Sequence, residues 1–391
     1  METCDVLIVG GGPAGSSCAR RLAAAGLDVL VTDRAAFPRD KPCAGWVTPG
    51  TLETLGVDPA EYAHAGTVQA FTGFVTGRIG GPAVETSYGR AVSYGIRRCE
   101  LDHFLLARSG ARVRTGAAVA RFARAGGDWI VDDQVRTPLL VGAGGHFCPV
   151  ARALNGPAPK RSLVVAQEVE FRLSRRQSDD CRVRSEVPEL YFCPDLRGYG
   201  WCVRKGTYLN VGLGRRDPER LADHVRDFVS FLEERRRVPA DLPRRWLGHP
   251  YQVYERTSRR VVDDGLLLVG DAAGLAAAAS GEGIRPAIES GLLAAEAILA
   301  AGGRYRRPEL EPYRTALESR LGRRQRRTGV PAALARAISA PLLASPWVAR
   351  HLILDRWFLQ RHRPVLRPEG RFARPGKEEG HASHEAQELP G

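Results

Sequence analysis

The chain has 391 residues, enough for one large domain or two interleaved domains that each bury a core. Hydrophobic residues make up 43% and charged residues 26% of it, as in globular proteins, and no apolar run is long enough to predict a transmembrane helix. The net charge of +13 comes almost entirely from arginine. These arginines are spread over many segments without a nucleic-acid-binding motif, so we expect solvated surface and no nucleic-acid partner.

The eight cysteines include no C-x-x-C pair, so we expect no metal site and no disulfide framework. Buried free thiols are typical of a reducing compartment. The chain passes from Met1 almost directly into an apolar run, without the segments of a signal peptide. We therefore expect a cytoplasmic protein.

The first predicted element, residues 6–9, is a short apolar run typical of a buried parallel strand. Gly10, Gly12 and Gly15 follow with G-x-G-x-x-G spacing, which allows a tight turn and close approach of a pyrophosphate. Pro13 fits the first turn of a helix, whose amino end would face the phosphates. This pattern predicts a dinucleotide site.

A second apolar run, residues 29–32, ends in Asp33. A carboxylate roughly 20 residues past the glycines stands where a ribose hydroxyl needs an acceptor. An ordinary strand-helix-strand turn is the alternative at this point, and the downstream sequence decides between the two.

Residues 37–47, FPRDKPCAGWV, are predicted to form a loop because proline and glycine interrupt them repeatedly. The elements predicted after this loop are a short helix capped by Thr48 and ending at Gly56, strands within 67–96, a helix over 96–108, antiparallel strands at 117–123 and 129–131, and an apolar strand at 139–143.

Alternating apolar and polar positions over 163–213 predict an antiparallel sheet. Within it, Tyr191, Phe192, Tyr199 and Trp201 lie among glycines. These rings either line a pocket for an apolar substrate or pack as core, and both readings stay open. An amphipathic helix is predicted at about 218–236.

A third buried strand within 265–269 ends in Gly270 and Asp271, and a helix over 284–300 follows. Three separated strands that each end in glycine indicate a discontinuous nucleotide-binding domain of Rossmann-like α/β class with a β-sheet domain inserted. The predicted boundaries are 1–62, 91–150 and 260–300 for the nucleotide domain, 63–90 and 151–259 for the substrate domain, 301–365 for a helical C-terminal part and 366–391 for a disordered tail.

The helical C-terminal part has a leucine- and tryptophan-rich stretch bordered by Arg350, Arg356 and Arg361. Such a stretch either packs against the domains or lies on a membrane surface as a peripheral contact at the inner face. The oligomeric state is not predicted by the sequence.

Five motifs together resemble the FAD-dependent oxidoreductases built like p-hydroxybenzoate hydroxylase, and within them the geranylgeranyl reductase family. These motifs are the glycine fingerprint with Asp33, the loop PRDKPCAGW, Arg98 with Asp102, VGAGG at 141–145, and GDAAG with SGEGI at 270–284. The reductase resemblance rests on PRDKPCAGW, on GYGW at 198–201 and on SGEGIRPAIESG. The chain departs from the wider fold at Gly144, where aspartate is usual, and at 275–279, which lack a common proline.

The resemblance implies that the glycine loop holds the FAD pyrophosphate and Asp33 the ribose. It places Arg98 and Asp271 near the phosphates or the ribityl chain, and the amides of 281–284 at the flavin ring. The residues assigned to the cofactor are Gly10, Gly12, Pro13, Ala14, Gly15, Asp33, Arg34, Lys41, Cys43, Ala44, Arg98, Gly270, Asp271, Gly281, Gly283 and Ile284. Cys43, Tyr199 and Trp201 are the candidates for contact with the reacting substrate.

The resemblance implies an FAD-dependent reductase that transfers hydride to C=C bonds of a small apolar, isoprenoid-like substrate, with NAD(P)H as the expected electron donor. The alternatives are a monooxygenase of the same fold and a non-catalytic isoprenoid carrier that has lost the flavin.

Overall fold

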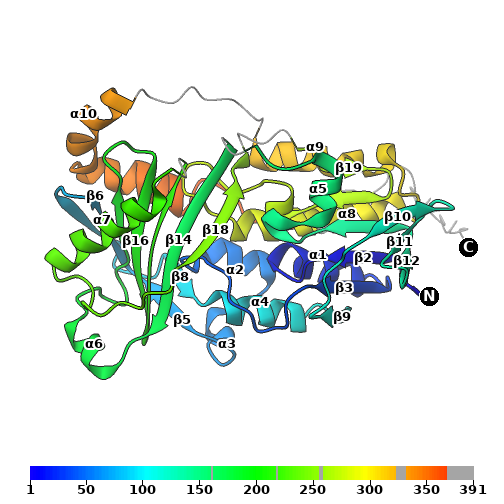
Figure 1. The fold of residues 1–391 in the computed structure, drawn as a ribbon, viewed down its shortest axis with the longest axis horizontal. Coiled ribbons are helices and arrows are strands. Elements are labelled where there is room, and N and C mark those ends of the chain that lie inside the picture. The colour runs from blue at the N-terminus through cyan, green and yellow to red at the C-terminus, as the bar shows by residue number, and fades with distance from the viewer. Residues whose placement is uncertain (160–161, 217–218, 255–258, 323–331, 368–391) are drawn as a thin grey trace, which may run out of the picture.

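A computed structural model describes residues 1–159, 162–216, 219–254, 259–322 and 332–367. Figure 1 shows two parts side by side, each built around a large sheet. One part contains a six-stranded sheet with α1 and α8, and the other contains a seven-stranded sheet with α7.

The six-stranded sheet has the strand order β19-β20-β13-β2-β3-β9 and is parallel except for β19. Its strands are β2 Val6–Val9, β3 Val29–Asp33, β9 Arg112–Thr115, β13 Leu139–Gly142, β19 Val262–Asp263 and β20 Leu266–Leu268. Every residue of β2, β13 and β20 is buried, as expected where both faces of a parallel sheet are covered. The three predicted strands are confirmed.

Helices pack around this sheet, and α1 and α8 also pack against each other. A Cβ at Gly291 would lie 2.2 Å from the Ala14 carbonyl oxygen, so only glycine permits this approach. The helices of this part are α1 Pro13–Ala24, α2 Pro49–Leu55, α3 Pro59–Tyr62, α4 Arg98–Ala107, α5 Pro149–Asn155, α8 Ile284–Ala301 and α9 Arg307–Leu321. The helix predicted over 96–108 begins two residues later because Ile96 belongs to a strand.

The seven-stranded sheet has the order β18-β14-β17-β16-β15-β6-β7. Its strands are β6 Gly73–Arg78, β7 Ala83–Ser87, β14 Leu163–Arg172, β15 Glu189–Phe192, β16 Gly198–Lys205, β17 Tyr208–Arg215 and β18 Leu247–Gln252. The helices of this part are α6 Arg175–Asp180 and α7 Leu221–Glu234. The antiparallel prediction for residues 163–213 is confirmed for the pairs among β14, β15, β16 and β17. Outside that range β18 also pairs antiparallel with β14 and β7 with β6, whereas β6 joins β15 as a parallel neighbour.

The remaining described strands form two smaller sheets. The first consists of β4 Trp46–Val47, β5 Val68–Phe71 and β8 Ser93–Ile96. The second consists of β1 Glu2–Thr3, β10 Phe122–Ala125, β11 Asp128–Val131 and β12 Val135–Thr137.

The helical C-terminal part contains α10 Ala332–Leu343 and a π-helix, Val348–Phe358, whose buried residues join a core cluster with the seven-stranded sheet. Leu366 is buried in the core of the other part. Within the described ranges no single helix could cross a membrane by length and apolarity, although the bent pair Ala337–Leu343 and Val348–Phe358 together meets those criteria. The predicted disorder of the tail concerns mainly residues 368–391, which lie outside the described residues.

Candidate active site

A pocket of about 620 Å³ is lined by both large sheets, by the starts of α1 and α8 and by the loop 39–46. Of the predicted site residues, those in its wall are Gly10, Gly12, Pro13, Ala14, Asp33, Arg34, Lys41, Cys43, Ala44, Arg98, Tyr199, Trp201, Gly270, Asp271, Gly281, Gly283 and Ile284. Gly15 is the exception. A Cβ there would lie 1.9 Å from the Gly10 carbonyl oxygen, so Gly15 allows tight packing below the wall.

The glycine turn at the start of α1 exposes backbone to the pocket. Gly10 has φ +118°, and a Cβ there would lie 2.4 Å from the Ala143 carbonyl. A Cβ at Gly12 would contact only Arg39 Nη2, at 3.5 Å. Among the described residues no side chain caps this helix. Its first N–H groups are therefore available to an anion in the pocket.

Asp33 closes the same end of the pocket from the tip of β3. Its Oδ2 accepts a hydrogen bond from the Gly11 N–H at 2.8 Å, and its Oδ1 accepts one from the Ala35 N–H at 2.9 Å. These bonds orient the carboxylate, and each oxygen keeps acceptor capacity for a hydroxyl group. Beside it, the Arg34 guanidinium lies 5.9 Å from the Phe147 ring centre.

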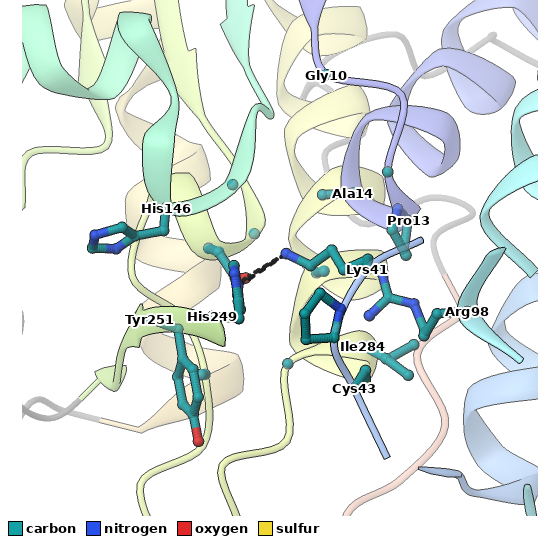
Figure 2. A pocket seen from close by; sticks show the side chains of 18 of the residues that line it. Gly10, Pro13, Ala14, Lys41, Cys43, Arg98, His146, His249, Tyr251 and Ile284 are labelled. Atoms are coloured by element: carbon teal, nitrogen blue, oxygen red, sulfur yellow. Dashed lines mark hydrogen bonds and ion pairs between the residues drawn. The ribbon is translucent and has the colours of Figure 1, made fainter. Parts of the chain in front are cut away.

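Lys41, His249 and Asp271 form a polar cluster on the pocket wall. Figure 2 shows Lys41 reaching across to His249, with an Nζ to Nε2 distance of 3.0 Å. Asp271 Oδ2 lies 3.4 Å from both nitrogens. The cluster links the loop, β18 and the turn after β20.

The electrostatics of this cluster follow from burial and from proximity. Burial lowers the pKa of Lys41, and Asp271 opposes that change. Burial also lowers the pKa of His249, so its imidazole is neutral near neutral pH. Burial alone would raise the pKa of Asp271, but Lys41 and His249 outweigh it and hold that pKa below its usual range.

Arg98 is held at the pocket by a buried carboxylate. Its Nε and Nη2 donate to the two oxygens of Asp102 at 2.9 and 3.0 Å, and Arg39 Nη1 lies 3.2 Å from the same carboxylate. Asp102 is fully buried. The two residues of the Arg98 motif thus form an ion pair, which leaves two cationic side chains along the wall.

The start of α8 faces the pocket, and two further titratable groups, Glu282 and His146, line its wall. No side chain among the described residues caps this helix at Gly283. Burial raises the pKa of Glu282 to about 7. His146 has a buried Nδ1 without a hydrogen-bond partner in the described structure, and burial lowers its pKa to about 4. The wall therefore offers a neutral imidazole and free backbone amides.

The loop that carries Cys43 is held by three side chains from the seven-stranded sheet. Glu168 Oε1 accepts from the Cys43 N–H at 2.6 Å, and Asn210 Nδ2 donates to the Cys43 carbonyl at 3.2 Å. Lys205, whose side chain is fully buried, donates to the Ala44 carbonyl at 3.1 Å. This network fixes the loop backbone at the pocket.

The remaining wall is aromatic. The Trp46 ring stacks on Phe74 at 4.9 Å and on Phe358 at 5.2 Å between ring centres. Tyr199 meets Phe358 edge to face at 5.3 Å, and Trp201 donates from Nε1 to Asn210 at 2.7 Å. Tyr199 and Trp201 line the pocket and also pack in a core cluster, whereas Tyr191 and Phe192 pack in core clusters and do not line the pocket. That the pocket takes an apolar substrate stays a prediction.

Sequence reasoning missed several wall residues: His146, Glu168, His249, Tyr251, Glu282 and Phe358. For Glu168, a signal was available, because a carboxylate stands among apolar residues in a predicted strand. His249 gave none, since LGHPYQ has no strand pattern. No cluster of three metal-binding side chains occurs in the described ranges.

Comparison with known proteins shows the family to which the chain belongs. The chain matches the FAD binding domain family over residues 3–313. It is 34% identical to menaquinone reductase of Mycobacterium tuberculosis over 325 residues, covering 75% of this chain and 76% of the relative. It is 30% identical to geranylgeranyl diphosphate reductase of Rhodobacter capsulatus over 311 residues, 76% of this chain and 75% of the relative.

The fold is also found among solved structures. A geranylgeranyl bacteriochlorophyll reductase-like protein from Thermoplasma acidophilum superposes with a TM-score of 0.74 at 20% identity, over 93% of this chain and 98% of that one. The predicted fold class is confirmed by this match. The chain belongs to the FAD binding domain family and, within it, to the geranylgeranyl reductase family of FAD-dependent oxidoreductases.

Proposed function

We propose that this protein is an FAD-dependent reductase that saturates C=C bonds of an isoprenoid chain. The observation that carries the proposal is one pocket with two chemically different ends. The uncapped start of α1 and Asp33 line one end, and Trp46, Tyr199 and Trp201 line the other, where Tyr199 donates to the Ser280 carbonyl in the segment before α8. The substrates named for the two curated relatives, menaquinone and geranylgeranyl diphosphate, both carry an isoprenoid chain.

The wall fits FAD on its own geometry. The backbone N–H groups of Gly12 and Ala14 would face the pyrophosphate, and Asp33 would accept from the adenosine ribose. Asp271 and Arg98 would lie along the ribityl chain and phosphates, and the start of α8 at Gly283 would face the ring. The remaining residues assigned to the cofactor by sequence stay predictions.

When bound, reduced FAD supplies a hydride, and the protein supplies placement and a dry site. Trp46 is sandwiched between two aromatic rings, and Trp201 is only 6% exposed. Flat aromatic walls of this kind hold a flexible apolar chain and exclude water from it.

Cys43 is proposed to contact the cofactor ring or the reacting double bond. Its backbone is fixed by Glu168 and Asn210, and it lines the pocket beside Ala44. We expect Cys43→Ala to retain flavin and to lose about tenfold in turnover. Unchanged turnover would dismiss the role.

Peripheral membrane contact is proposed for the C-terminal helices. Leu334, Ile338 and Trp347 are 52%, 39% and 67% exposed. Exposed arginines, Arg350 and Arg356, follow in the next helix. Apolar side chains beside cations suit a surface of anionic lipid.

A flotation assay tests this contact. We expect the protein to float with vesicles containing phosphatidylglycerol and Trp347→Ser to float much less. The control is Val113→Ser, which removes another exposed apolar side chain, on β9. Equal flotation of the two variants would contradict the proposal.

The reductase is tested first by the visible spectrum of the purified protein and then by anaerobic addition of NADPH, the proposed donor. We expect flavin bands that bleach, and geranylgeranyl diphosphate that gains two hydrogens per double bond by mass spectrometry.

Other outcomes would contradict the proposal. Product that gains oxygen in air would indicate the monooxygenase. A colourless protein that does not take up FAD would indicate the carrier.

A further inference from the structure

Glu168 lies in a row of side chains that crosses the seven-stranded sheet at the pocket. In this row Glu168 on β14 pairs with Gly212 on β17, and Gly212 pairs with Trp201 on β16. Aligned residues on neighbouring strands point to the same face. The carboxyl group and the indole therefore flank a position without a side chain.

Glycine is required at this position. A Cβ at Gly212 would lie 2.3 Å from the Trp201 ring and 2.8 Å from the Glu168 Cβ. The indole thus packs against the stem of Glu168, which is 5% exposed. Although Glu168 lines the pocket, it is largely shielded from bulk water.

One oxygen of Glu168 is engaged and the other is not. Oε1 accepts from the Cys43 N–H at 2.6 Å. Oε2 is buried and has no hydrogen-bond partner among the described residues. A buried carboxyl oxygen without a partner is costly when ionised, and a proton on it removes that cost.

The charged neighbours do not compensate Glu168 in full. Lys205 is the nearby cation, but its ammonium contacts Glu170, the Ala44 carbonyl and the Ile96 carbonyl. Glu170 adds a like charge, while Asn210 and the Cys43 N–H favour the ionised form. Burial outweighs them and raises the pKa of Glu168 to about 7.

We propose that Glu168 is the proton donor of the reduction, with its Oε2 as the donating atom. This inference rests on the proposed reductase function. The π bond of the substrate breaks, one carbon gains the hydride supplied by the reduced cofactor, and the other carbon gains the Glu168 proton. The substrate is reduced, the cofactor is oxidised, and the Glu168 carboxylate recovers a proton from water.

Glu168→Gln separates proton donation from loop support, because glutamine can keep a carbonyl oxygen for the Cys43 N–H but carries no acidic proton. We expect this variant to bind FAD and bleach with NADPH as wild type does, and to lose 10²–10⁴-fold in substrate turnover. Glu168→Asp, with a shorter acid, should recover part of the loss. Val169→Ala, which faces α7 and not the pocket, should leave turnover unchanged.

Infrared difference spectroscopy of the holoenzyme gives a readout independent of turnover. We expect protonated carboxyl absorption at pH 6 that disappears with a midpoint near 7. Glu282 contributes to it as well, so the Glu168 band is the part that is lost in Glu168→Gln and kept in Glu282→Gln. A wild-type spectrum without this band, or full turnover in Glu168→Gln, would overturn the assignment. If the proposed reductase function is wrong, the outcome differs, because the wild-type protein then reduces no polyprenyl substrate.

Discussion

The two faces of the seven-stranded sheet have different roles, although their residues alternate along the same strands. Val169, Val211 and Leu213 point to α7 and form an apolar cluster with Phe228 and Leu232. Their strand neighbours on the other face hold the Cys43 loop and line the pocket; these are Glu168, Glu170, Asn210, Trp201 and Lys205. One face is built for stability and the other for placing groups.

The difference has a physical cause. Apolar burial against α7 is non-directional and tolerates small shifts. The pocket face buries carboxyl, amide and ammonium groups, each of which needs a partner at a defined position. Changes on the first face should alter stability alone, and changes on the second should alter the site as well.

The largest loss of stability is expected from Phe228→Ala on the α7 face. Phe228 is fully buried and packs on Gly200, whose Cβ would lie 2.5 Å from its ring. Urea unfolding should show a loss of about 3–5 kcal/mol. FAD affinity, measured by fluorescence quenching, should stay at the wild-type value, and a parallel loss of FAD affinity would break the comparison.

Lys205→Met tests the buried ion pair of the pocket face. Removing the ammonium leaves Glu170 with Arg97, at 3.4 Å, as its remaining cation, and it takes the Lys205 donor away from the Ala44 and Ile96 carbonyls. We expect a loss of about 3 kcal/mol in the free energy of unfolding and weaker FAD binding. The double variant Lys205→Met/Glu170→Gln should be more stable than Lys205→Met alone, and a less stable double variant would contradict the pairing.

Two glycines of β17 form a matched pair. A Cβ at Gly212 collides with Trp201 and Glu168, whereas one at Gly214 makes ordinary contacts of 3.5 and 3.7 Å. Gly212→Ala should lose about 1–3 kcal/mol of stability and most substrate turnover, and Gly214→Ala should stay within about 0.5 kcal/mol of wild type. Similar unfolding midpoints for both variants would contradict the tight contact.

The smallest expected effect is a pH dependence of the free energy of unfolding, which arises from Glu168 on the pocket face and which the α7 face lacks. The pKa of Glu168 is about 7 in the folded protein against 4.5 without the fold. Its contribution to stability is therefore complete below pH 4.5 and is lost as the pH rises through 7.

The stability difference between wild type and Glu168→Gln isolates this group from other carboxylates. From pH 4.5 to 7.5 we expect that difference to fall by about 1–3 kcal/mol. A difference that does not change with pH would show that Glu168 is already ionised in the fold.

The sequence alone determined the features that depend on neighbours in the chain. Gly10, Pro13 and Asp33 belong to one strand-helix-strand unit, so their arrangement follows from the unit itself. The alternation over 163–213 likewise determined that two faces exist. The residues predicted for the site all line the pocket except Gly15. The domain boundaries stay a prediction.

Only the tertiary structure decided which polar residues meet. Glu168, Lys205 and His249 contact Cys43, Ala44 and Lys41 across 125, 161 and 208 positions of the chain. Those pairings depend on strand register and on how the two sheets face each other, and a shift of one residue would turn Glu168 toward α7. Local patterns contain periodicity but no register between distant strands, which is why the acid of the pocket emerges only from the folded chain.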